Sequence, residues 1–283
     1  MKTLDFIKMH SLGNDFVIFD QLKKSFKFSK SQIKKISDRN FGIGCDQILI
    51  LKKSNKKEIS FEYKIYNKDG SESGQCGNGA KCVAKYYFDH YGNNKKEIKI
   101  ETKTRTMFLR RGKNKNIEVD MGLPKFNSSE FIKGKYANFL YNRKKYSFNE
   151  VFIGNPHAVF FTKNIKHIDL EDFANKFNKK GIFKKGVNIS IVENMSKNNW
   201  RARIYERGSG ETMACGSAAC AIAASLKFHK KVVSSSNYVH MQGGKAHVKW
   251  SKNASDSVHL IGSAEYVYFC LLYTSPSPRD LDL

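Results

Sequence analysis

The sequence predicts an α+β fold made of two structurally similar lobes. The first observation is an internal duplication, in which Cys76-Gly-Asn-Gly-Ala80 matches Cys215-Gly-Ser-Ala-Ala219, 139 residues later. Gly13-Asn14 likewise recurs as Gly154-Asn155, with an offset of 141 residues. The second observation is that both halves combine strand-like segments with two helix-like segments in the same order. Together these observations indicate two homologous halves.

Further landmarks support the duplication and place its boundary. Three pairs keep nearly the same offset, and they are Asn67 with Glu206, Glu72 with Glu211 and Gln47 with Asn188. Between residues 112 and 125 the chain is punctuated by Gly112, Gly122 and Pro124, which is typical of a linker. We therefore expect an N-terminal lobe at residues 1–117 and a C-terminal lobe at residues 118–269.

In the first half the pattern predicts a short helix, a longer helix and seven strands. The short helix is expected at Lys30–Asp38 and is stopped by Gly42. The longer helix runs from Gly77 to His90, after a loop rich in glycine and serine. Strands are predicted where apolar and β-branched residues run or alternate, at Leu4–Met9, Phe16–Phe19, Gln47–Lys52, Ile59–Tyr66, Ile98–Thr102, Arg105–Arg110 and Asn116–Met121.

The second half predicts the same order of elements. Its helices are expected at Leu170–Lys179 and Gly216–Phe228, the latter again after a glycine-containing loop. Its strands are predicted at Val151–Ile153, Ala158–Phe161, Asn188–Val192, Arg201–Tyr205, Tyr238–Met241, Ala246–Trp250 and Ser257–Ile261. No low-complexity segment interrupts either half.

The two duplicated cysteines each follow a glycine-containing loop and precede a helical run. Each thiol is therefore expected at a helix N-terminus, where backbone N–H groups and the helix dipole favour anions. This position is expected to lower the pKa of both Cys76 and Cys215 and to make thiolate accessible near neutral pH. Gly77 and Gly79 allow the backbone to approach a ligand closely. One such cysteine is more simply explained by packing, but two in register favour a catalytic pair.

A duplicated fold with one such helix start in each lobe predicts an active site in a cleft between the lobes. There a thiolate would remove the α-proton from one face of a substrate carbon, and a thiol would return a proton to the other face. The helix starts would bind the α-carboxylate and stabilise its developing negative charge. This chemistry requires no cofactor, and no lysine of the chain can be singled out as a pyridoxal Schiff-base residue.

The remaining cysteines and histidines do not indicate a metal site. Cys82 and Cys220 lie on runs of alanine and valine, and Cys45 adjoins the Asp46-Gln47 motif, so we interpret all three as core thiols. No two cysteines show CxxC spacing, and the histidines show no ligand spacing. We therefore expect neither a metal nor a disulfide framework.

The net charge of +24 raises the alternative of a nucleic-acid-binding protein. The excess is almost all lysine, and the lysines are scattered in twos and threes rather than gathered on one amphipathic face. The chain is also rich in Asn, Ile, Phe and Tyr, the products of A/T-rich codons. We interpret the charge as a solvated surface that can steer acidic substrates, because no aromatic and basic patch or known module is present. A small-molecule substrate is expected, and no nucleic acid.

The two ends of the sequence bear on location and on the extent of the fold. No apolar run is long enough to span a bilayer, and residues Met1–Asp5 lack the apolar region of a signal peptide, so we expect a cytoplasmic protein without membrane contact. The segment Cys270–Asp280 resembles a translated sequencing-library adapter. We therefore interpret residues 270–283 as a non-native tail and leave them out of the fold prediction.

The two cysteine motifs and five other motifs of the sequence resemble those of the diaminopimelate epimerases. These cofactor-independent enzymes interconvert LL- and meso-diaminopimelate on the way to lysine and peptidoglycan. The resemblance extends from about Thr3 to Val267. It is carried by the ordered motifs Gly13-Asn-Asp-Phe16, Gly44-Cys-Asp-Gln47, Asn67-Lys-Asp-Gly-Ser71, Cys76-Gly-Asn-Gly79, Gly154-Asn-Pro-His157, Glu206-Arg-Gly-Ser-Gly-Glu-Thr212 and Ala214-Cys-Gly-Ser217.

The resemblance implies a role for each matching residue. Cys76 and Cys215 would be the acid/base pair, and His157 and Glu206 would tune their pKa values. The implied substrate pocket consists of Asn14, Gln47, Asn67, Gly77, Asn78, Asn155, Asn188, Glu206, Arg207, Gly216 and Ser217. In it Arg207 would form a two-point bond with the distal carboxylate, and Glu206 would face an ammonium group. The family fold wraps a mixed sheet around a central helix in each lobe, and its members are commonly homodimers.

Some positions depart from the family, and two related activities compete with the leading hypothesis. Lys81, Ala218 and Ser263 stand where the family usually has Arg, Gly and Pro, but none of them removes a catalytic or pocket group. Proline racemases and hydroxyproline epimerases share the two-cysteine logic. They lack the combination of Glu206-Arg207 with three pocket asparagines. An isomerase class from phenazine biosynthesis has the same fold without the two cysteines.

Overall fold

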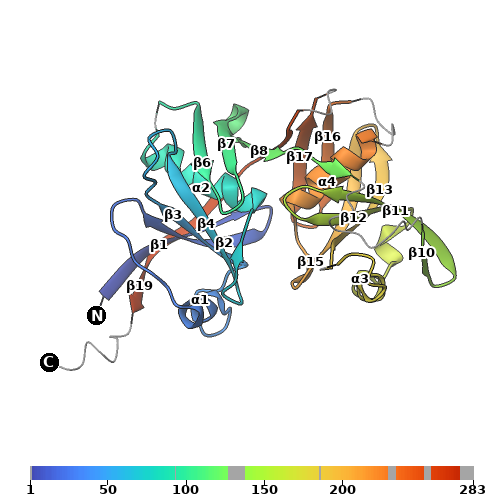
Figure 1. The fold of residues 1–283 in the computed structure, drawn as a ribbon, viewed down its shortest axis with the longest axis horizontal. Coiled ribbons are helices and arrows are strands. Elements are labelled where there is room, and N and C mark those ends of the chain that lie inside the picture. The colour runs from blue at the N-terminus through green and yellow to red at the C-terminus, as the bar shows by residue number, and fades with distance from the viewer. Residues whose placement is uncertain are drawn as a thin grey trace. The chain divides into compact units, whose positions relative to one another are not determined.

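The computed structural model describes residues 2–92, 94–126, 138–184, 186–228, 234–251 and 256–274. They form two compact units, each with its own strands and helices (Figure 1). The first unit contains residues 1–11, 15–109 and 264–283, and the second contains residues 12–14 and 110–263. None of the helices in the described ranges is long and apolar enough to cross a membrane.

The first unit is a mixed sheet around the helix α2. Its elements are β1 (Lys2–Ser11), β2 (Asn14–Gln21), α1 (Lys30–Ser37), β3 (Gln47–Lys52), β4 (Phe61–Asn67), β5 (Glu72–Ser73), α2 (Gly77–His90), β6 (Glu97–Glu101), β7 (Thr106–Arg111) and β19 (Glu265–Thr274). β2 pairs with β3 in parallel, β3 with β4 antiparallel, and β4 with β6 in parallel. α2 lies among these strands and buries most of its residues (Figure 1).

The second unit repeats this plan around the helix α4. Its elements are β8 (Ile117–Gly122), β9 (Lys125–Phe126), β10 (Asn138–Tyr141), β11 (Lys144–Phe152), β12 (Pro156–Phe161), α3 (Leu170–Lys179), β13 (Asn188–Ser196), β14 (Asn199–Glu206), β15 (Gly210–Thr212), α4 (Gly216–Phe228), β16 (Ser236–Met241), β17 (Gly244–Trp250) and β18 (Val258–Gly262). β12 pairs with β13 in parallel, β13 with β14 antiparallel, and β14 with β16 in parallel.

Strand registers match between the two units, which supports the duplication read from the sequence. Phe16 faces Gln47 in the β2–β3 pair, and His157 faces Asn188 in the β12–β13 pair. Both equivalent positions are 141 residues apart. A shift of one residue would turn every side chain of a strand to the other face. The shared register therefore brings equivalent side chains to equivalent places in each unit.

The central helices and the flanking helices are formed for different reasons. α4 is built almost entirely of small or apolar side chains and packs against strands β11, β12, β13, β16, β17 and β18. The flanking helices α1 and α3 are amphipathic and begin at side-chain caps. Ser29 forms a capping box with Gln32, and Asp169 accepts from the backbone N–H of Asp172. They therefore cover their sheets from outside, while α2 and α4 fill the centres.

The core of the second unit is rich in aromatic rings. Phe139, Phe160, Phe173 and Phe177 meet mainly edge to face, with ring centroids 5.0–6.4 Å apart. Phe160 is fully buried, as expected for a residue of a β core. The cluster lies between α3 and strands β10 to β13.

The structure contains strands that were not predicted, namely β5, β9, β10, β15 and β19, and several predicted strands have other bounds. The strand predicted at Val151–Ile153 is longer and starts at Lys144, because Asn142 and Arg143 adopt positive φ angles and form a two-residue hairpin turn. Cys270–Thr274, left out of the fold prediction, continue β19 and pair with β1. Residues 275–283 of the predicted tail lie outside the described residues.

The division of the chain also differs from the predicted boundary at residues 117 and 118. The chain leaves the first unit after Leu109 and returns to it at Ala264–Thr274. The reason is the antiparallel pairing of β19 with β1, which joins the C-terminal strand to the N-terminal strand. Glycine and proline punctuation marks loops but carries no information on such long-range pairing.

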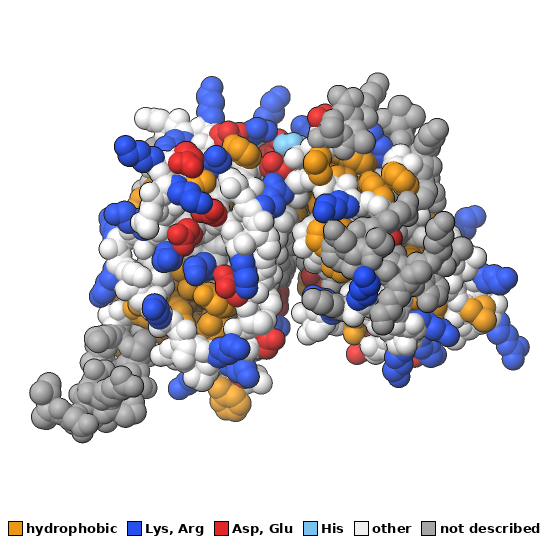
Figure 2. All heavy atoms as spheres, viewed as in Figure 1, with side chains coloured by type: hydrophobic (Ala, Val, Ile, Leu, Met, Phe, Trp, Pro, Cys, Tyr) orange, Lys and Arg blue, Asp and Glu red, His pale blue; other side chains and the backbone are white. Residues whose placement is uncertain are grey.

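Basic side chains are spread over the surface rather than concentrated. Figure 2 shows Lys and Arg singly or in small groups on the face in view, with Asp and Glu between them. Exposed pairs such as Lys56 with Glu101 and Lys176 with Asp172 illustrate this mixture. On the described part of this face the charge has the character of a solvated surface.

Candidate active site

Cys76 is the N-cap residue of α2. Its backbone is extended, and its Sγ accepts a hydrogen bond from the backbone N–H of Gly79 at 3.3 Å. The thiol is half-buried, whereas Gly77 and Asn78, which follow it, are buried. The prediction that a helix begins directly after this cysteine is therefore confirmed.

Close packing beneath the start of α2 explains Gly79. A Cβ added there would lie 2.3 Å from Oη of Tyr63 and 3.1 Å from a methyl group of Leu49. Tyr63 is almost fully buried, and its hydroxyl donates to the carbonyl of Cys76 at 3.4 Å. Burial raises the pKa of Tyr63, so this hydroxyl stays protonated. Tyr63 therefore supports the cysteine from below, a role that the sequence motifs did not reveal.

Gln47 and Asn67 face each other across the β3–β4 pair. Nε2 of Gln47 donates to Oδ1 of Asn67 at 2.9 Å, and Nδ2 of Asn67 donates to Oγ of Ser71 at 3.0 Å. The structure thus brings together two pocket residues predicted from separate motifs.

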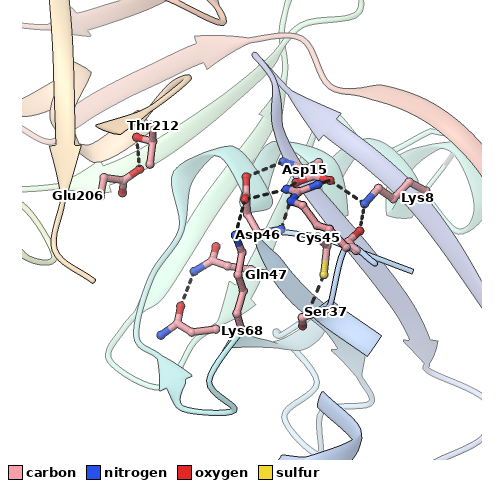
Figure 3. A network of polar contacts seen from close by, with 12 residues as sticks. Lys8, Asp15, Ser37, Cys45, Asp46, Gln47, Lys68, Glu206 and Thr212 are labelled. Atoms are coloured by element: carbon pink, nitrogen blue, oxygen red, sulfur yellow. Dashed lines mark hydrogen bonds and ion pairs between the residues drawn. The ribbon is translucent and has the colours of Figure 1, made fainter. Parts of the chain in front are cut away.

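A charge cluster that is buried at Lys8 and exposed at Arg39 joins the starts of β2 and β3 (Figure 3). Asp15 accepts from Lys8 and Arg39, at 2.7 Å each, and from the backbone N–H of Asp46 at 3.1 Å. Asp46 binds Arg39 at 3.0 Å and Lys68 at 3.3 Å. Burial raises the pKa of Asp15, but Arg39 and Lys8 outweigh it and hold this pKa at about 2. Asp15 is therefore an ionic anchor that joins the start of β2 to Lys8 and Arg39.

In the second unit, Cys215 lies directly before α4. Its thiol donates to Oε2 of Glu206 at 3.1 Å and lies 3.4 Å from Oγ of Ser217. The backbone N–H of Ala218 also contacts this sulfur, as that of Gly79 contacts Cys76 three residues earlier. Thr212 donates to the other oxygen of Glu206 at 2.7 Å (Figure 3).

The predicted lowering of the Cys215 pKa is wrong. Cys215 is only 5 % exposed, and burial raises the pKa of its thiol well above the ordinary value. The negative charge of Glu206 raises it further, and the contacts from Ser217 and Ala218 only partly oppose this. The helix start is present, but desolvation and a neighbouring carboxylate outweigh it. Cys215 is therefore a protonated thiol at neutral pH.

His157 is fully buried and neutral. Burial lowers its pKa to about 3, so the imidazole carries no charge at physiological pH. Nε2 lies 2.8 Å from Oδ1 of Asn155 and 3.1 Å from Oγ of Ser217. Because the amide oxygen can only accept, Nε2 carries the proton. Ser217 lies between the two residues His157 and Cys215, because its hydroxyl contacts both Nε2 of His157 and Sγ of Cys215.

Asn188 and Arg207 are linked through the backbone. Oδ1 of Asn188 accepts from the backbone N–H of Arg207 at 2.9 Å, which fixes the turn after β14. The Arg207 side chain passes over Gly186, where an added Cβ would come within 3.1 Å of Cδ. Gly186 also has a positive φ of 72°, so it serves both the turn and this approach.

The predicted site residues fall into two groups. Gln47, Asn67, Cys76, Gly77 and Asn78 belong to the first unit, and Asn14 is grouped with the second unit although it begins β2. In the second unit hydrogen bonds join residues from four separate places in the chain, namely Asn155, His157, Glu206, Thr212, Cys215 and Ser217. Thr212 was not predicted, although its motif was quoted. Cys45, Cys82 and Cys220 are buried, as expected for core thiols.

Comparison with known proteins agrees with these motifs. The family model described as diaminopimelate epimerase matches residues 6–127 and 150–267. A diaminopimelate epimerase from Blochmanniella floridana is 38% identical over 272 residues, covering 93% of this chain and 97% of the relative. One from Buchnera aphidicola subsp. Baizongia pistaciae is 35% identical over 271 residues, covering 94% of each chain.

Solved structures support the same fold. A phenazine biosynthesis protein from Bacillus anthracis has a TM-score of 0.72 at 15% identity, covering 97% of this chain and all of that one. A hydroxyproline epimerase from Agrobacterium vitis has a TM-score of 0.71 at 11% identity, covering 95% of this chain and 92% of that one. These likenesses concern the fold alone. The family match and the full-length relatives show that the chain belongs to the diaminopimelate epimerase family.

Proposed function

We propose that this chain interconverts LL- and meso-diaminopimelate without a cofactor, with Cys76 and Cys215 as its acid/base residues. The reaction would serve the supply of lysine and of peptidoglycan precursors. The observation that carries the proposal is the contrast between two equivalent cysteines. Both sulfurs contact a backbone N–H at a helix start, but the thiol of Cys215 also donates a hydrogen bond to the carboxylate of Glu206.

This contrast fits the chemistry of inversion. A proton must leave one face of the α-carbon and another must reach the opposite face, so one thiol must start ionised and the other protonated. The raised pKa of Cys215 keeps its proton in place for delivery. In the direction of the reaction in which Cys215 delivers the new proton, Cys76 is the thiolate that removes the α-proton. In the reverse direction Glu206 can take the proton of Cys215 directly, because the two are in hydrogen-bond contact.

The remaining groups suit the other needs of the substrate. Backbone N–H groups at the starts of α2 and α4 can bind the α-carboxylate and stabilise the charge that develops on it. Arg207 can pair with the distal carboxylate through two parallel hydrogen bonds. Neutral His157 supports Ser217 and adds no charge beside Cys215.

The experiment is a coupled assay on LL-diaminopimelate beside L-proline and L-glutamate. The proposal predicts turnover of diaminopimelate at least about 10²-fold above the other two, because a site built for distal polar groups rejects substrates without them. Turnover of L-proline at a comparable rate would instead favour the racemase alternative. No turnover of any of the three would refute the proposal.

Two further parts of the proposal concern assembly and location. We infer from the family that the chain acts as a homodimer in the cytoplasm. Light scattering on the purified chain at assay concentration should give twice the mass of 32.4 kDa. A single-chain mass in an active preparation would contradict the dimer.

A further inference from the structure

A chain of hydrogen bonds runs from Asp69 to Gln47 within the first unit. Oδ1 of Asp69 accepts from Oγ of Ser71 at 2.6 Å and from the backbone N–H of Ser71 at 2.8 Å. Ser71 in turn accepts from Nδ2 of Asn67 at 3.0 Å, and Asn67 accepts from Nε2 of Gln47 at 2.9 Å. Three successive side-chain links therefore separate an exposed carboxylate from a pocket amide.

The chemistry of each group permits only one direction of donation along this chain. An ionised carboxylate can only accept, so the single hydroxyl proton of Ser71 points to Asp69. Ser71 then has only lone pairs for Asn67, which must present its NH₂ group. The oxygen of Asn67 consequently faces Gln47, and Gln47 must donate through its own NH₂ group.

The backbone holds these groups in place. Asn67 and Ser71 are the two ends of a tight turn, in which the N–H of Asn67 donates to the carbonyl of Ser71 at 2.9 Å. Gly70 occupies the position with a φ of +80°, and an added Cβ would come 3.1 Å from Lys30. The turn therefore fixes the distance over which Ser71 relays the orientation.

We propose that Asp69 is a positioning residue that acts through Ser71 and Asn67 and makes Gln47 present its amide oxygen to a cationic ammonium group of the substrate. The proposal rests on the proposed function, in which Gln47 contacts an amino-acid substrate. Oε1 is the amide atom of Gln47 that does not contact Asn67. If the hydrogen bonds ran in the opposite direction, Gln47 would present its NH₂ group instead, which repels an ammonium.

The sharpest variant is Ser71→Ala, because the backbone N–H of residue 71 still reaches Asp69 and the turn is kept. We expect its KM for diaminopimelate to rise about tenfold, as for a lost hydrogen bond to a charged group, with kcat changed less than about twofold. Ser71→Thr keeps a hydroxyl and should restore the KM. An unchanged KM in Ser71→Ala would overturn the proposal.

Asp38 provides a matched control for Asp69. It is also exposed and accepts from two backbone N–H groups of a turn, those of Asn40 and Phe41, but within the described first unit no series of hydrogen bonds leads from it to Gln47. Asp69→Asn should raise KM, and Asp38→Asn should not, although both remove a turn carboxylate. Equal KM values for the two variants would reduce the role of Asp69 to turn stability.

The direction of donation along the hydrogen bonds from Gln47 to Asp69 can also be tested without any substrate. Gln47→Glu places a second acceptor-only group at the other end, so Asn67 and Ser71 can no longer satisfy both ends. Asp69→Asn removes that conflict. In urea unfolding the double variant should be more stable than additive effects of the two single variants predict. The unfolding equilibrium constant should be about fivefold smaller than that additive value. Additive effects would overturn the inference, whereas a wild-type chain inactive on diaminopimelate would refute only the proposed function.

Discussion

The thiol of Cys215 donates a hydrogen bond to Oε2 of Glu206 at 3.1 Å, from the start of α4 to the end of β14. The equivalent pair in the first unit is Cys76 and Asn67, nine residues apart in the same way, but an uncharged amide replaces the carboxylate. The duplication has thus kept the position of the thiol and changed the charge beside it. Burial and this carboxylate together hold the proton on Cys215.

Replacing the carboxylate tests this assignment. In Glu206→Gln the thiol of Cys215 loses a neighbouring negative charge that raises its pKa, so that pKa should fall. Because the reaction needs Cys215 protonated in one direction, the alkaline limb of its kcat/KM profile should move to lower pH. The profile should be measured in both directions of the reaction. An alkaline limb at an unchanged pH would show that Glu206 does not control this thiol.

Thr212→Val is the companion variant, since it removes the hydrogen bond to the other oxygen of Glu206 while keeping the carboxylate charge. A carboxylate with one fewer donor is more basic and holds the shared proton more tightly. We therefore expect a smaller rate loss than in Glu206→Gln and no downward shift of the alkaline limb.

The two cysteines can be separated by isotope exchange. Cys76→Ala and Cys215→Ala should each lower epimerisation by about 10³-fold or more, because general acid or base catalysis is lost on one face. The remaining thiol can still exchange the α-hydrogen on its own face with solvent deuterium. Mass spectrometry of recovered substrate should therefore show deuterium without inversion. Full turnover in Cys215→Ala would end the two-cysteine mechanism.

The sequence predicted the elements well because their signals are local. α2 was predicted with the bounds that the structure shows, since Gly-rich punctuation, a capping position and an apolar run coincide there. Pocket residues in motifs, such as Gln47 and Asn67, were likewise found in contact. Two features depend on residues that are distant in the sequence. The pKa of Cys215 depends on burial and on Glu206, and the position of β19 depends on its pairing with residues near the N-terminus.

The charge cluster around Asp15 escaped prediction for the same reason. Lys8, Arg39 and Asp46 come from three separate segments, and none of them forms a motif with Asp15 by spacing alone. Only the parallel register of β2 and β3 brings Asp15 and Asp46 side by side. The hydroxyl of Tyr63 reaches the carbonyl of Cys76, whereas periodicity within β4 shows Tyr63 only as a buried position.

The charge cluster predicts a pH-dependent stability. Asp15 has a pKa of about 2 in the folded chain against an ordinary 3.8, so its contribution is present above pH 3.8 and is lost as the pH falls through 2. The difference corresponds to roughly 2 kcal/mol. Asp15→Asn should lower the free energy of unfolding by about this amount or more at pH 7, where it also leaves Lys8 without a charged partner.

The measurement is urea unfolding of wild type and Asp15→Asn from pH 7 down to pH 2. The difference between them should narrow as the pH falls, because the wild-type carboxyl becomes protonated and resembles the amide. Glu101→Gln is a control, since it removes an exposed pair with Lys56 and should cost less than about 1 kcal/mol. A constant difference across this pH range would contradict the assigned pKa.

The packing at the start of α2 gives the last prediction. Gly79→Ala would place a methyl group 2.3 Å from Oη of buried Tyr63, so the helix start or the ring must move. Overpacking of this kind typically costs about 1–3 kcal/mol. The displacement would also move the N–H of residue 79 away from Cys76, so activity should fall by more than stability alone explains.

Gly92→Ala, near the other end of α2, is the control, because the added methyl group meets only ordinary contacts at 3.4 Å and should be tolerated. Tyr63→Phe removes the oxygen in the way, so the double variant Gly79→Ala with Tyr63→Phe should recover part of both losses. Purely additive losses in that double-mutant cycle would show that the hydroxyl of Tyr63 is not what selects glycine beside the catalytic thiol.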